Sequence, residues 1–207
     1  MCIDPYLSDA VEEFTGKKRI VPPPIRAEDI NANAVVCTHN HLDHLDIKII
    51  DKLLPTVFFA PSDCKNILKE CGAGDIAQFN EGDKAVVGDI GLEAVYANHT
   101  VPAIGIIVTC EGKKLYFSGD TYYDKKLENL KEYNIDYAFI CINGKLGNMN
   151  VDEAVYLTKK IHPNIAIPNH YGMFLENTED PMPFLNQLDN GFIMEVGREY
   201  EVSECLI

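Results

Sequence analysis

Apolar residues in the first third of this chain form two short runs, each followed by a stretch with helical spacing. The runs, 33–38 and 56–60, are continuous and short, which is typical of strands covered on both faces. Residues 46–55 repeat apolar side chains at helical intervals, with an aspartate at the start and a proline at the end. Residues 61–72 predict a second helix ending at a glycine. The predicted order is β-α-β-α.

The middle of the chain has four apolar runs separated by short turns. The turns are of Gly-Asp, Gly and Glu-Gly type, and such turns favour antiparallel hairpins. We therefore predict an antiparallel meander whose strands are residues 84–87, 92–96, 105–109 and 114–118.

Helical spacing and buried-strand runs alternate again in the last third. One helix is expected to begin behind Asn150, because Glu153 stands in the position that completes a capping box. The final two runs are expected to form a strand pair that closes the chain. The predicted elements are helices 124–133 and 151–161 and strands 137–142, 165–168, 192–196 and 199–202.

The N-terminal region has no comparable periodicity. Residues 3–8 are expected to end a strand and enter a loop, and residues 9–29 become proline-rich. Since consecutive prolines cannot join a sheet ladder, we predict a loop that lies over one face. The order of elements favours an α/β fold with helices outside two sheets packed face to face. A length of 207 residues favours one domain, residues 1–207.

The amino-acid composition excludes several classes of binding partner. A net charge of -14 repels nucleic acid, so no nucleic-acid partner is expected. No apolar run approaches the ~20 residues of a membrane span, and the N-terminus shows no secretory signal, so no membrane partner is expected. Seven scattered cysteines without a CxxC pair do not resemble a disulfide framework. We expect a cytoplasmic protein with a small-molecule substrate.

Three histidines and an aspartate follow the first predicted strand. His39 and His41 are two residues apart, so their side chains leave an extended backbone on the same side. Asp43 and His44 are adjacent and converge only if the chain turns there. Imidazole and carboxylate suit zinc, iron or manganese, and no thiolate pair lies near enough for a closed structural zinc site. This spacing predicts two neighbouring metal sites.

Three further ligand-type residues stand at the ends of predicted strands. They are His99, Asp120 and His170, and strand ends are where active-site loops collect. Each one alone is equally consistent with a turn residue that caps its own strand. Together the two groups use five of the six histidines, and we expect the remaining one, His162, to face solvent without a role.

In order and approximate spacing, these residues resemble the ligand pattern of the metallo-β-lactamase superfamily over nearly the whole chain. Segments 3–8, 117–121 and 142–150 look like those of its ascorbate-6-phosphate lactonase-like branch. The resemblance implies a four-layer αββα metallo-β-lactamase-like sandwich and a metal-dependent hydrolase. It further implies one metal on His39, His41 and His99, a second on Asp43, His44 and His170, and Asp120 bridging both.

The resemblance also implies two divalent metal ions as cofactors. The lactonase-like branch is associated with manganese and other members with zinc or iron, and the donor atoms alone do not decide among them. Asp4 occupies the place where the superfamily has an aspartate behind the ligands. We expect it to orient a ligand histidine through the other ring nitrogen, although an Asp-Pro turn is the alternative reading.

The chain departs from the superfamily pattern at its start. Two strands normally precede the segment that matches residues 3–8, and this chain begins inside the second of them. The fold is therefore expected to lack the first N-terminal strand or strands. A sheet without them exposes an unpaired edge, and we predict a homo-oligomer or a strand exchange at this edge.

Hydrolysis by this site needs no serine nucleophile. We predict that a metal-bound hydroxide attacks the substrate and that Asp43 and Asp120 position it and accept its proton. For an anionic substrate, the loop after residue 142 offers backbone amides and one cation. A glycine-rich connection and an ordinary tyrosine are the alternative readings. The candidate substrate-binding residues are Asn143, Lys145, Asn148 and Tyr171.

These inferences favour a lactonase that opens a small, sugar-derived and optionally phosphorylated lactone. A phosphodiesterase or another ester hydrolase on the same two-metal site is the first alternative, because a fold does not fix a substrate. A catalytically idle metal-binding or partner-binding protein is the alternative from another class. The complete ligand set argues against idleness.

Overall fold

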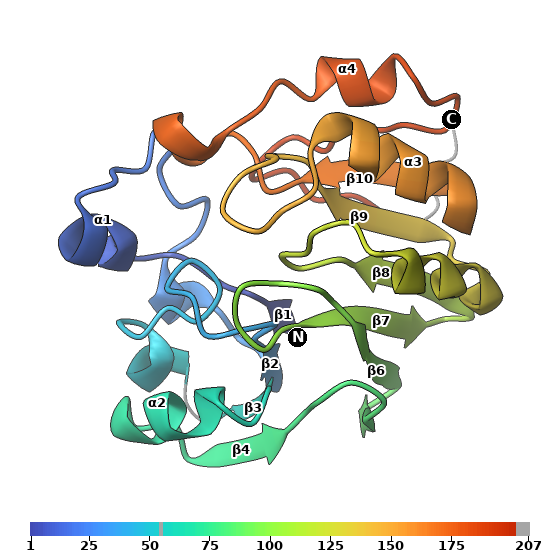
Figure 1. The fold of residues 1–207 in the computed structure, drawn as a ribbon. Helices are drawn as coiled ribbons and strands as arrows, with labels where there is room; N and C mark the ends of the chain where they lie inside the picture. The colour runs from blue at the N-terminus through green and yellow to red at the C-terminus, as the bar shows by residue number, and fades with distance from the viewer. Residues whose placement is uncertain (54–55, 202–207) are drawn as a thin grey trace.

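Two β-sheets form the centre of the protein in the computed structural model, which describes residues 1–53 and 56–201. The first sheet is parallel throughout, with strand order β1-β2-β3-β4 (Figure 1). Its strands are β1 (Cys2–Ile3), β2 (Ala34–Val36), β3 (Val57–Ala60) and β4 (Asp75–Gln78).

The second sheet has the order β10-β9-β8-β7-β6-β5. Strands β5 to β8 pair antiparallel in sequence order, so the predicted meander is confirmed. Strands β8, β9 and β10 are parallel to one another. The strands are β5 (Lys84–Val87), β6 (Ile90–Tyr96), β7 (Ile104–Cys110), β8 (Lys113–Phe117), β9 (Tyr137–Cys141) and β10 (Ile165–Asn169).

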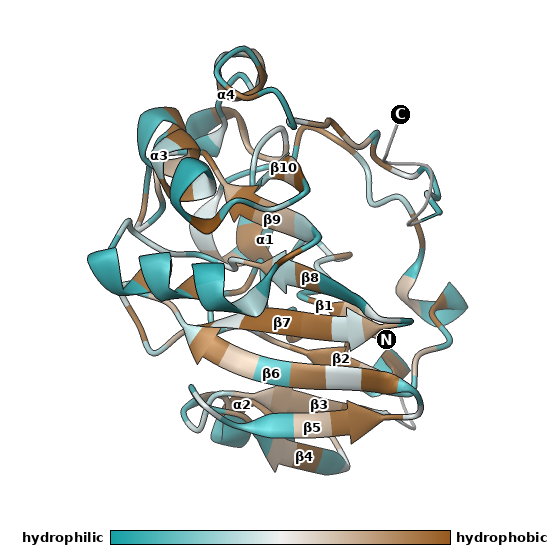
Figure 2. Ribbon diagram, turned by 90° about the vertical axis from the view of Figure 1, so that its right-hand side faces the viewer, coloured by the Kyte–Doolittle hydropathy of each residue, from teal (hydrophilic) through white to brown (hydrophobic). Residues whose placement is uncertain are grey.

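Neighbouring residues of β2 show how both faces of the first sheet are covered. Val36 packs with Phe59 and with Ile106 of the second sheet, so the two sheets face each other. Val35 points the opposite way, as alternate strand residues do, and packs with Leu68 of the helix α2 (Cys64–Glu70). Strands such as β7 are accordingly coloured hydrophobic over most of their length (Figure 2).

Two helical segments cover the outer face of the second sheet. They are α3 (Val151–Ile161) and the 3-10 helix η3 (Lys125–Tyr133), and both contribute to one core cluster with β8 and β9. The capping box of α3 is confirmed: the Asn150 side chain accepts from the Glu153 N–H at 2.9 Å, and the Asn150 N–H donates to Glu153 Oε2 at 3.0 Å. Helix, sheet, sheet and helix form the four layers of the predicted αββα sandwich.

The helix predicted over 46–55 is largely wrong within the described residues. A 3-10 turn, η2 (Ile50–Leu53), is the helical part, and residues 54–55 lie outside the described residues. The Asp46 carboxylate accepts from the Lys48 N–H at 3.2 Å, as expected of a capping residue, and also from the Leu7 and Ser8 N–H groups at 3.0 and 2.8 Å. The expected capping residue therefore anchors the N-terminal loop as well.

Residues 9–29 contain two helical segments that the sequence analysis did not predict. They are α1 (Ala10–Thr15) and the 3-10 turn η1 (Ala27–Asp29). Val11 of α1 is buried with Tyr6 and Phe174, a contact between distant parts of the sequence that a local pattern does not reveal. Strand β4 was also missed, because its residues are only partly buried and form no continuous apolar run.

The strand pair predicted at 192–196 and 199–202 is wrong for the residues that the structure describes, and residue 202 lies outside them. Instead, one bridge joins Gly191 to Ala166 of β10. The Phe192 N–H donates to the Ala166 carbonyl at 2.8 Å, after which the chain turns away. The short segments η4 (Leu175–Asn177) and α4 (Met182–Leu185) complete the C-terminal region.

Strand β1 lies at the edge of the first sheet and pairs there with β2. The predicted association of a second copy at this edge stays a prediction. Among the helices that the structure describes, none has the length and apolar character required to cross a membrane.

Candidate metal centre

The candidate ligands follow the C-terminal ends of four strands. His39 and His41 follow β2, His99 follows β6, Asp120 follows β8 and His170 follows β10. These strand ends gather at one end of the two sheets (Figure 1). The fold thus brings residues from positions 39 to 170 into one site.

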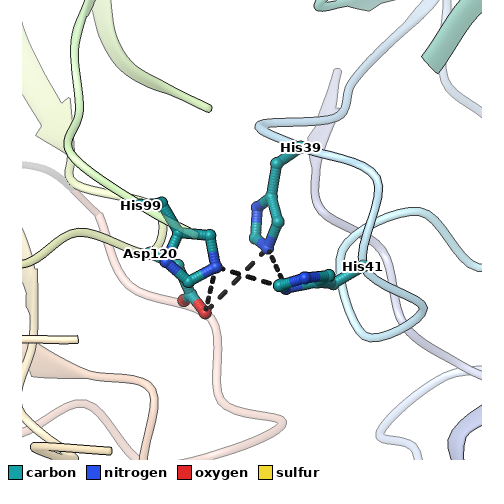
Figure 3. A group of neighbouring side chains, drawn as sticks. All are labelled: His39, His41, His99 and Asp120. Atoms are coloured by element: carbon teal, nitrogen blue, oxygen red, sulfur yellow. Dashed lines mark hydrogen bonds and ion pairs between the residues drawn. The ribbon is translucent and has the colours of Figure 1, made fainter. Parts of the chain in front are cut away.

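Four side chains form the first group: His39, His41, His99 and Asp120, each with one candidate ligand atom within 4.8 Å of the others. Figure 3 shows them pointing toward one another. The Nδ1 atom of His41 lies 3.0 Å from Nε2 of His39 and 3.2 Å from Nε2 of His99. Two Nε2 atoms and one Nδ1 atom therefore converge.

The second group consists of Asp43, His44 and His170, whose candidate ligand atoms also lie within 4.8 Å of one another. The Nε2 atoms of His44 and His170 are 3.2 Å apart. Oδ2 of Asp43 is 3.7 Å from Nε2 of His44 and 3.5 Å from Nε2 of His170. The adjacent residues Asp43 and His44 thus converge as the predicted turn requires.

Asp120 lies between the two groups. Its Oδ2 atom faces the first group, 4.0 Å from His39 Nε2 and 3.8 Å from His99 Nε2. Its Oδ1 atom faces the second group, 3.3 Å from His44 Nε2 and 3.1 Å from His170 Nε2. Oδ1 is buried without a hydrogen-bond partner in the described part of the chain. One carboxylate oxygen is therefore directed at each group.

Hydrogen bonds behind the rings fix which nitrogen faces the site. The carboxylate Oδ2 of Asp4 lies 2.8 Å from Nδ1 of His44, and the carbonyl of Gly147 lies 3.1 Å from Nδ1 of His99. Both oxygens can only accept, so Nδ1 carries the proton in each ring and Nε2 presents a lone pair to the site. Asp4 lies where its predicted orienting role requires.

His39 is held in the same way by Thr38. The Thr38 hydroxyl donates to Asp4 Oδ2 at 2.7 Å, so it is left to accept from His39 Nδ1 at 3.1 Å. The sequence analysis did not identify Thr38 or Gly147 as orienting residues. A glycine pair in the 143–148 loop was a signal for Gly147, but nothing in the local pattern connects Thr38 with His39.

Burial and nearby charges set the protonation states of the candidate ligands. Burial lowers the pKa of His39 to about 2 and also lowers that of His41, so both imidazoles are neutral, as metal ligands must be. Burial opposes ionisation of Asp120, but the charges of His44 and His170 outweigh it and hold its pKa well below the usual range. The carboxylate is therefore ionised.

The two groups fit two metal ions. Nitrogen ligands 2.0–2.1 Å from a tetrahedral zinc lie about 3.3 Å from one another, and the facing ring nitrogens here are 3.0–3.2 Å apart. Imidazole with carboxylate is compatible with zinc, manganese and iron, so the donors indicate a binuclear site without selecting the metal.

Metal uptake is expected to release protons. Burial disfavours the charge on His44, but nearby carboxylates, Asp120 foremost, outweigh it and raise its pKa well above the usual value. The metal-free ring is then protonated at neutral pH, and a metal must displace that proton. We expect calorimetric titration at pH 7, in two buffers of different ionisation enthalpy, to show release of about one proton or more per chain. Affinity should fall as pH falls; metal uptake without proton release would contradict this.

A family model described as the Beta-lactamase superfamily domain matches residues 3–171, which include both ligand groups. The chain belongs to the metallo-β-lactamase superfamily. A UPF0173 metal-dependent hydrolase of Bacillus cereus is 30% identical over 212 residues, covering 94% of this chain and 88% of that protein. A UPF0173 metal-dependent hydrolase of Thermoplasma volcanium is 29% identical, covering 83% of this chain and 84% of that protein.

Within the superfamily, the chain therefore belongs to the UPF0173 metal-dependent hydrolase family. The fold agrees with that of Igni18, a metallo hydrolase of Ignicoccus hospitalis, with a TM-score of 0.74 and 24% identity, covering 96% of this chain and 90% of that chain. The resemblance to the lactonase-like branch of the superfamily stays a prediction.

A cavity of about 480 Å³ lies beside the metal ligands, and His41, Asp43 and Asp120 line it. The four predicted substrate-binding residues are not among the residues that line it. Asn143 and Asn148 are buried, with exposed fractions of 1% and 3%.

These two asparagines support their neighbours instead. Asn148 Oδ1 accepts from the Thr121 N–H at 3.0 Å, beside Asp120, and Asn143 Nδ2 donates to Asn177 Oδ1 at 2.7 Å. Neither asparagine lines this cavity, and the substrate-binding role of both stays a prediction. Asn177 does line the cavity and was missed.

The other two candidates are on the periphery. Lys145 is exposed, and its ammonium donates to the Glu176 carbonyl at 3.3 Å. Tyr171 is half-buried and packs against the core beneath α3, and burial raises the pKa of its hydroxyl. Their roles in substrate binding stay predictions.

Proposed function

We propose that this chain is a two-metal hydrolase of lactones or other carboxylic esters. The carboxylate of Asp120 carries the proposal, because its two oxygens face two separate groups of ligand atoms at the floor of an open cavity. When bound, two divalent ions would polarise the ester carbonyl and lower the pKa of a water molecule toward neutrality. His39, His41 and His99 would hold one ion, Asp43, His44 and His170 the other, and Asp120 both.

Asp43 is the residue best placed to move the proton. It lines the cavity, and its side chain is 22% exposed, against 6% for Asp120. Burial opposes its ionisation, but His44 and His170 outweigh burial and hold its pKa below the usual range. Asp43 can therefore accept a proton from the attacking water and return it to the leaving alkoxide as the acyl C–O bond breaks. A lactone opens in this way to a hydroxy acid.

Charge supports an ester over a phosphodiester of a polyanion. The chain carries a net charge of -14, which disfavours approach of polyanions. Among the described residues that line the cavity, Lys17 is the sole cationic side chain, because the imidazole of His41 is neutral. A single ammonium suits one anionic group on a small molecule.

The experiment is a substrate panel with metal-reconstituted protein. It contains an alkyl lactone, a phosphorylated sugar lactone, an alkyl ester and bis(p-nitrophenyl) phosphate, which represents the rival phosphodiesterase activity. Hydrolysis of a lactone or ester that requires added manganese or zinc supports the proposal. Turnover of the phosphodiester alone, or an inert protein with two bound metals, overturns it.

Replacing Asp43 with asparagine tests the proton transfer, provided that the variant binds as much metal as the parent, because Asp43 is also a candidate ligand. The amide keeps the shape of the side chain but accepts a proton poorly, and a positioned general base contributes about 10²–10⁴-fold to a rate. We expect kcat for the best panel substrate to fall by about 10²-fold or more, with a smaller change in KM. Asp51→Asn is the matched control, because Asp51 is exposed and outside the site. A kcat for Asp43→Asn within a few-fold of the parent would exclude this role.

A further inference from the structure

The cavity next to the metal ligands restricts which substrates fit. Its volume of about 480 Å³ is within the ordinary range for small-molecule sites. His41, Asp43 and Asp120 line it on the ligand side, so a molecule whose reacting carbonyl lies at those residues must place the rest of its atoms in this cavity.

Apolar side chains form much of the remaining wall. They are Val11, Leu42, Leu146 and Phe174. Val11 and Phe174 are buried in one cluster, and Leu42 packs against that cluster, so this wall is held in place. Leu146 is 59% exposed on the loop next to Gly147. A hydrocarbon group on this wall would remove the exposed apolar surface of Leu146 from water, which is favourable.

Three of the polar side chains of the cavity already use polar atoms in hydrogen bonds within the protein. The Thr15 hydroxyl donates to the Val11 carbonyl at 2.6 Å, and Asn40 Nδ2 donates to Asp63 at 2.9 Å. Asn177 Oδ1 accepts from Asn143. These atoms are not available to the hydroxyls of a sugar, and a buried hydroxyl without a partner costs binding free energy.

Lys17 brings one positive charge to the cavity. The helix α1 ends at Gly16, whose φ of 76° turns the chain, and the Lys17 N–H donates to Thr15 Oγ1 at 3.3 Å. No carboxylate in the described residues pairs with the Lys17 ammonium. The nearby Arg19 is different, because its guanidinium donates to the Tyr6 and Ser8 carbonyls at 3.1 Å. Lys17 is thus available to an anionic ligand.

We propose that the substrate is an ester or lactone that carries a hydrocarbon part and a separate anionic group. The hydrocarbon lies on the wall formed by Leu42, Leu146 and Phe174, and the Lys17 ammonium binds the anion. This assignment rests on the proposed hydrolase function, because it takes the metal ligands as the reacting end of the cavity. It replaces the phosphorylated sugar lactone with an amphiphilic acid as the substrate class.

Binding of unreactive probes tests the assignment without turnover. Octane-1-sulfonate carries an anion that is a weak metal ligand, and methyl octyl sulfone is its neutral counterpart. We expect the metal-loaded protein to bind the sulfonate about fivefold more tightly than the sulfone, the effect of one partly exposed ion pair. Lys17→Met should abolish this preference and Lys18→Met should retain it, because Lys18 is exposed and does not line the cavity.

The apolar wall is tested with chain length. One buried methylene is worth about fourfold in affinity, so octane-1-sulfonate should bind much more tightly than butane-1-sulfonate. Leu146→Ala should reduce that difference severalfold. Leu175→Ala is the control, because Leu175, the residue after Phe174, is 72% exposed and does not line the cavity.

The outcomes separate the two proposals. If the preference for the sulfonate survives in Lys17→Met, or chain length has no effect on binding, the substrate class is wrong even when the protein hydrolyses esters. If Lys17 and Leu146 control probe binding but no ester or lactone is hydrolysed, the amphiphilic ligand stands and the hydrolase function fails. Circular dichroism and metal content of each variant must match the parent.

Discussion

Asp120→Ala is expected to leave the protein folded with fewer than about one metal per chain, compared with two in the parent, and to reduce ester hydrolysis by at least about 10³-fold. Asp120 alone directs an oxygen at each ligand group, so its removal weakens both sites at once. After this removal, protonated His44 still has the carboxylates of Asp4 and Asp43 nearby to balance its positive charge. Elemental analysis after reconstitution with manganese or zinc measures the effect.

Asp136→Ala is the matched control for loss of a partly buried aspartate. Asp136 accepts hydrogen bonds from the Lys114 N–H at 2.9 Å and from Asn164 at 3.0 Å, remote from the candidate ligands. Its loss should lower stability and leave both metals in place. Two metals retained in Asp120→Ala would mean that the two ligand groups bind independently, which contradicts the bridging role.

The sequence predicted the elements whose signals are local. The β5–β6 and β7–β8 hairpins have glycine turns between short apolar runs, and α3 has a complete capping box. It failed where distant residues decide. Helix α1 packs on Phe174, more than 150 positions away, and the Asp46 carboxylate binds Leu7 and Ser8 of the N-terminal loop, nearly 40 positions away.

The same distinction applies to the candidate site. The grouping of the seven candidate ligand residues was predictable, because four lie within one six-residue motif and three stand at strand ends. The residues that line the cavity were not predictable from the sequence. The Ile20 N–H donates to the Met173 carbonyl at 2.8 Å, and this pairing of remote segments brings Lys17 and Phe174 to one cavity. Neither residue carries a sequence motif.

Orientation of the ligands leads to the second large prediction. Gly147 has a φ of 102°, and its carbonyl accepts from His99 Nδ1 at 3.1 Å. A Cβ atom at this position would lie 2.4 Å from that nitrogen and 2.5 Å from the adjoining ring carbon. Gly147→Ala should therefore displace the His99 ring and break the hydrogen bond that fixes its protonated nitrogen.

We expect Gly147→Ala to lose one metal of the two. The first ligand group contains His99, whereas Asp43, His44 and His170 are untouched. Loss of a residue that orients a ligand typically costs about 10–100-fold in metal affinity. When about two metal ions are supplied per chain, the metal content of the variant should therefore fall toward one per chain. A competitive chelator titration of the purified variant measures the two affinities separately.

Gly112→Ala separates this effect from backbone strain. Gly112 has a φ of 76° and nothing within 4 Å of its ideal Cβ, so alanine there meets a penalty for positive φ, about 1–2 kcal/mol, without a clash. Both variants should unfold more readily than the parent, but Gly112→Ala should keep two metals. If both variants lose metal equally, general destabilisation explains the loss. If Gly147→Ala binds one metal and Gly112→Ala binds two, the first ligand group depends on the Gly147 carbonyl for its geometry.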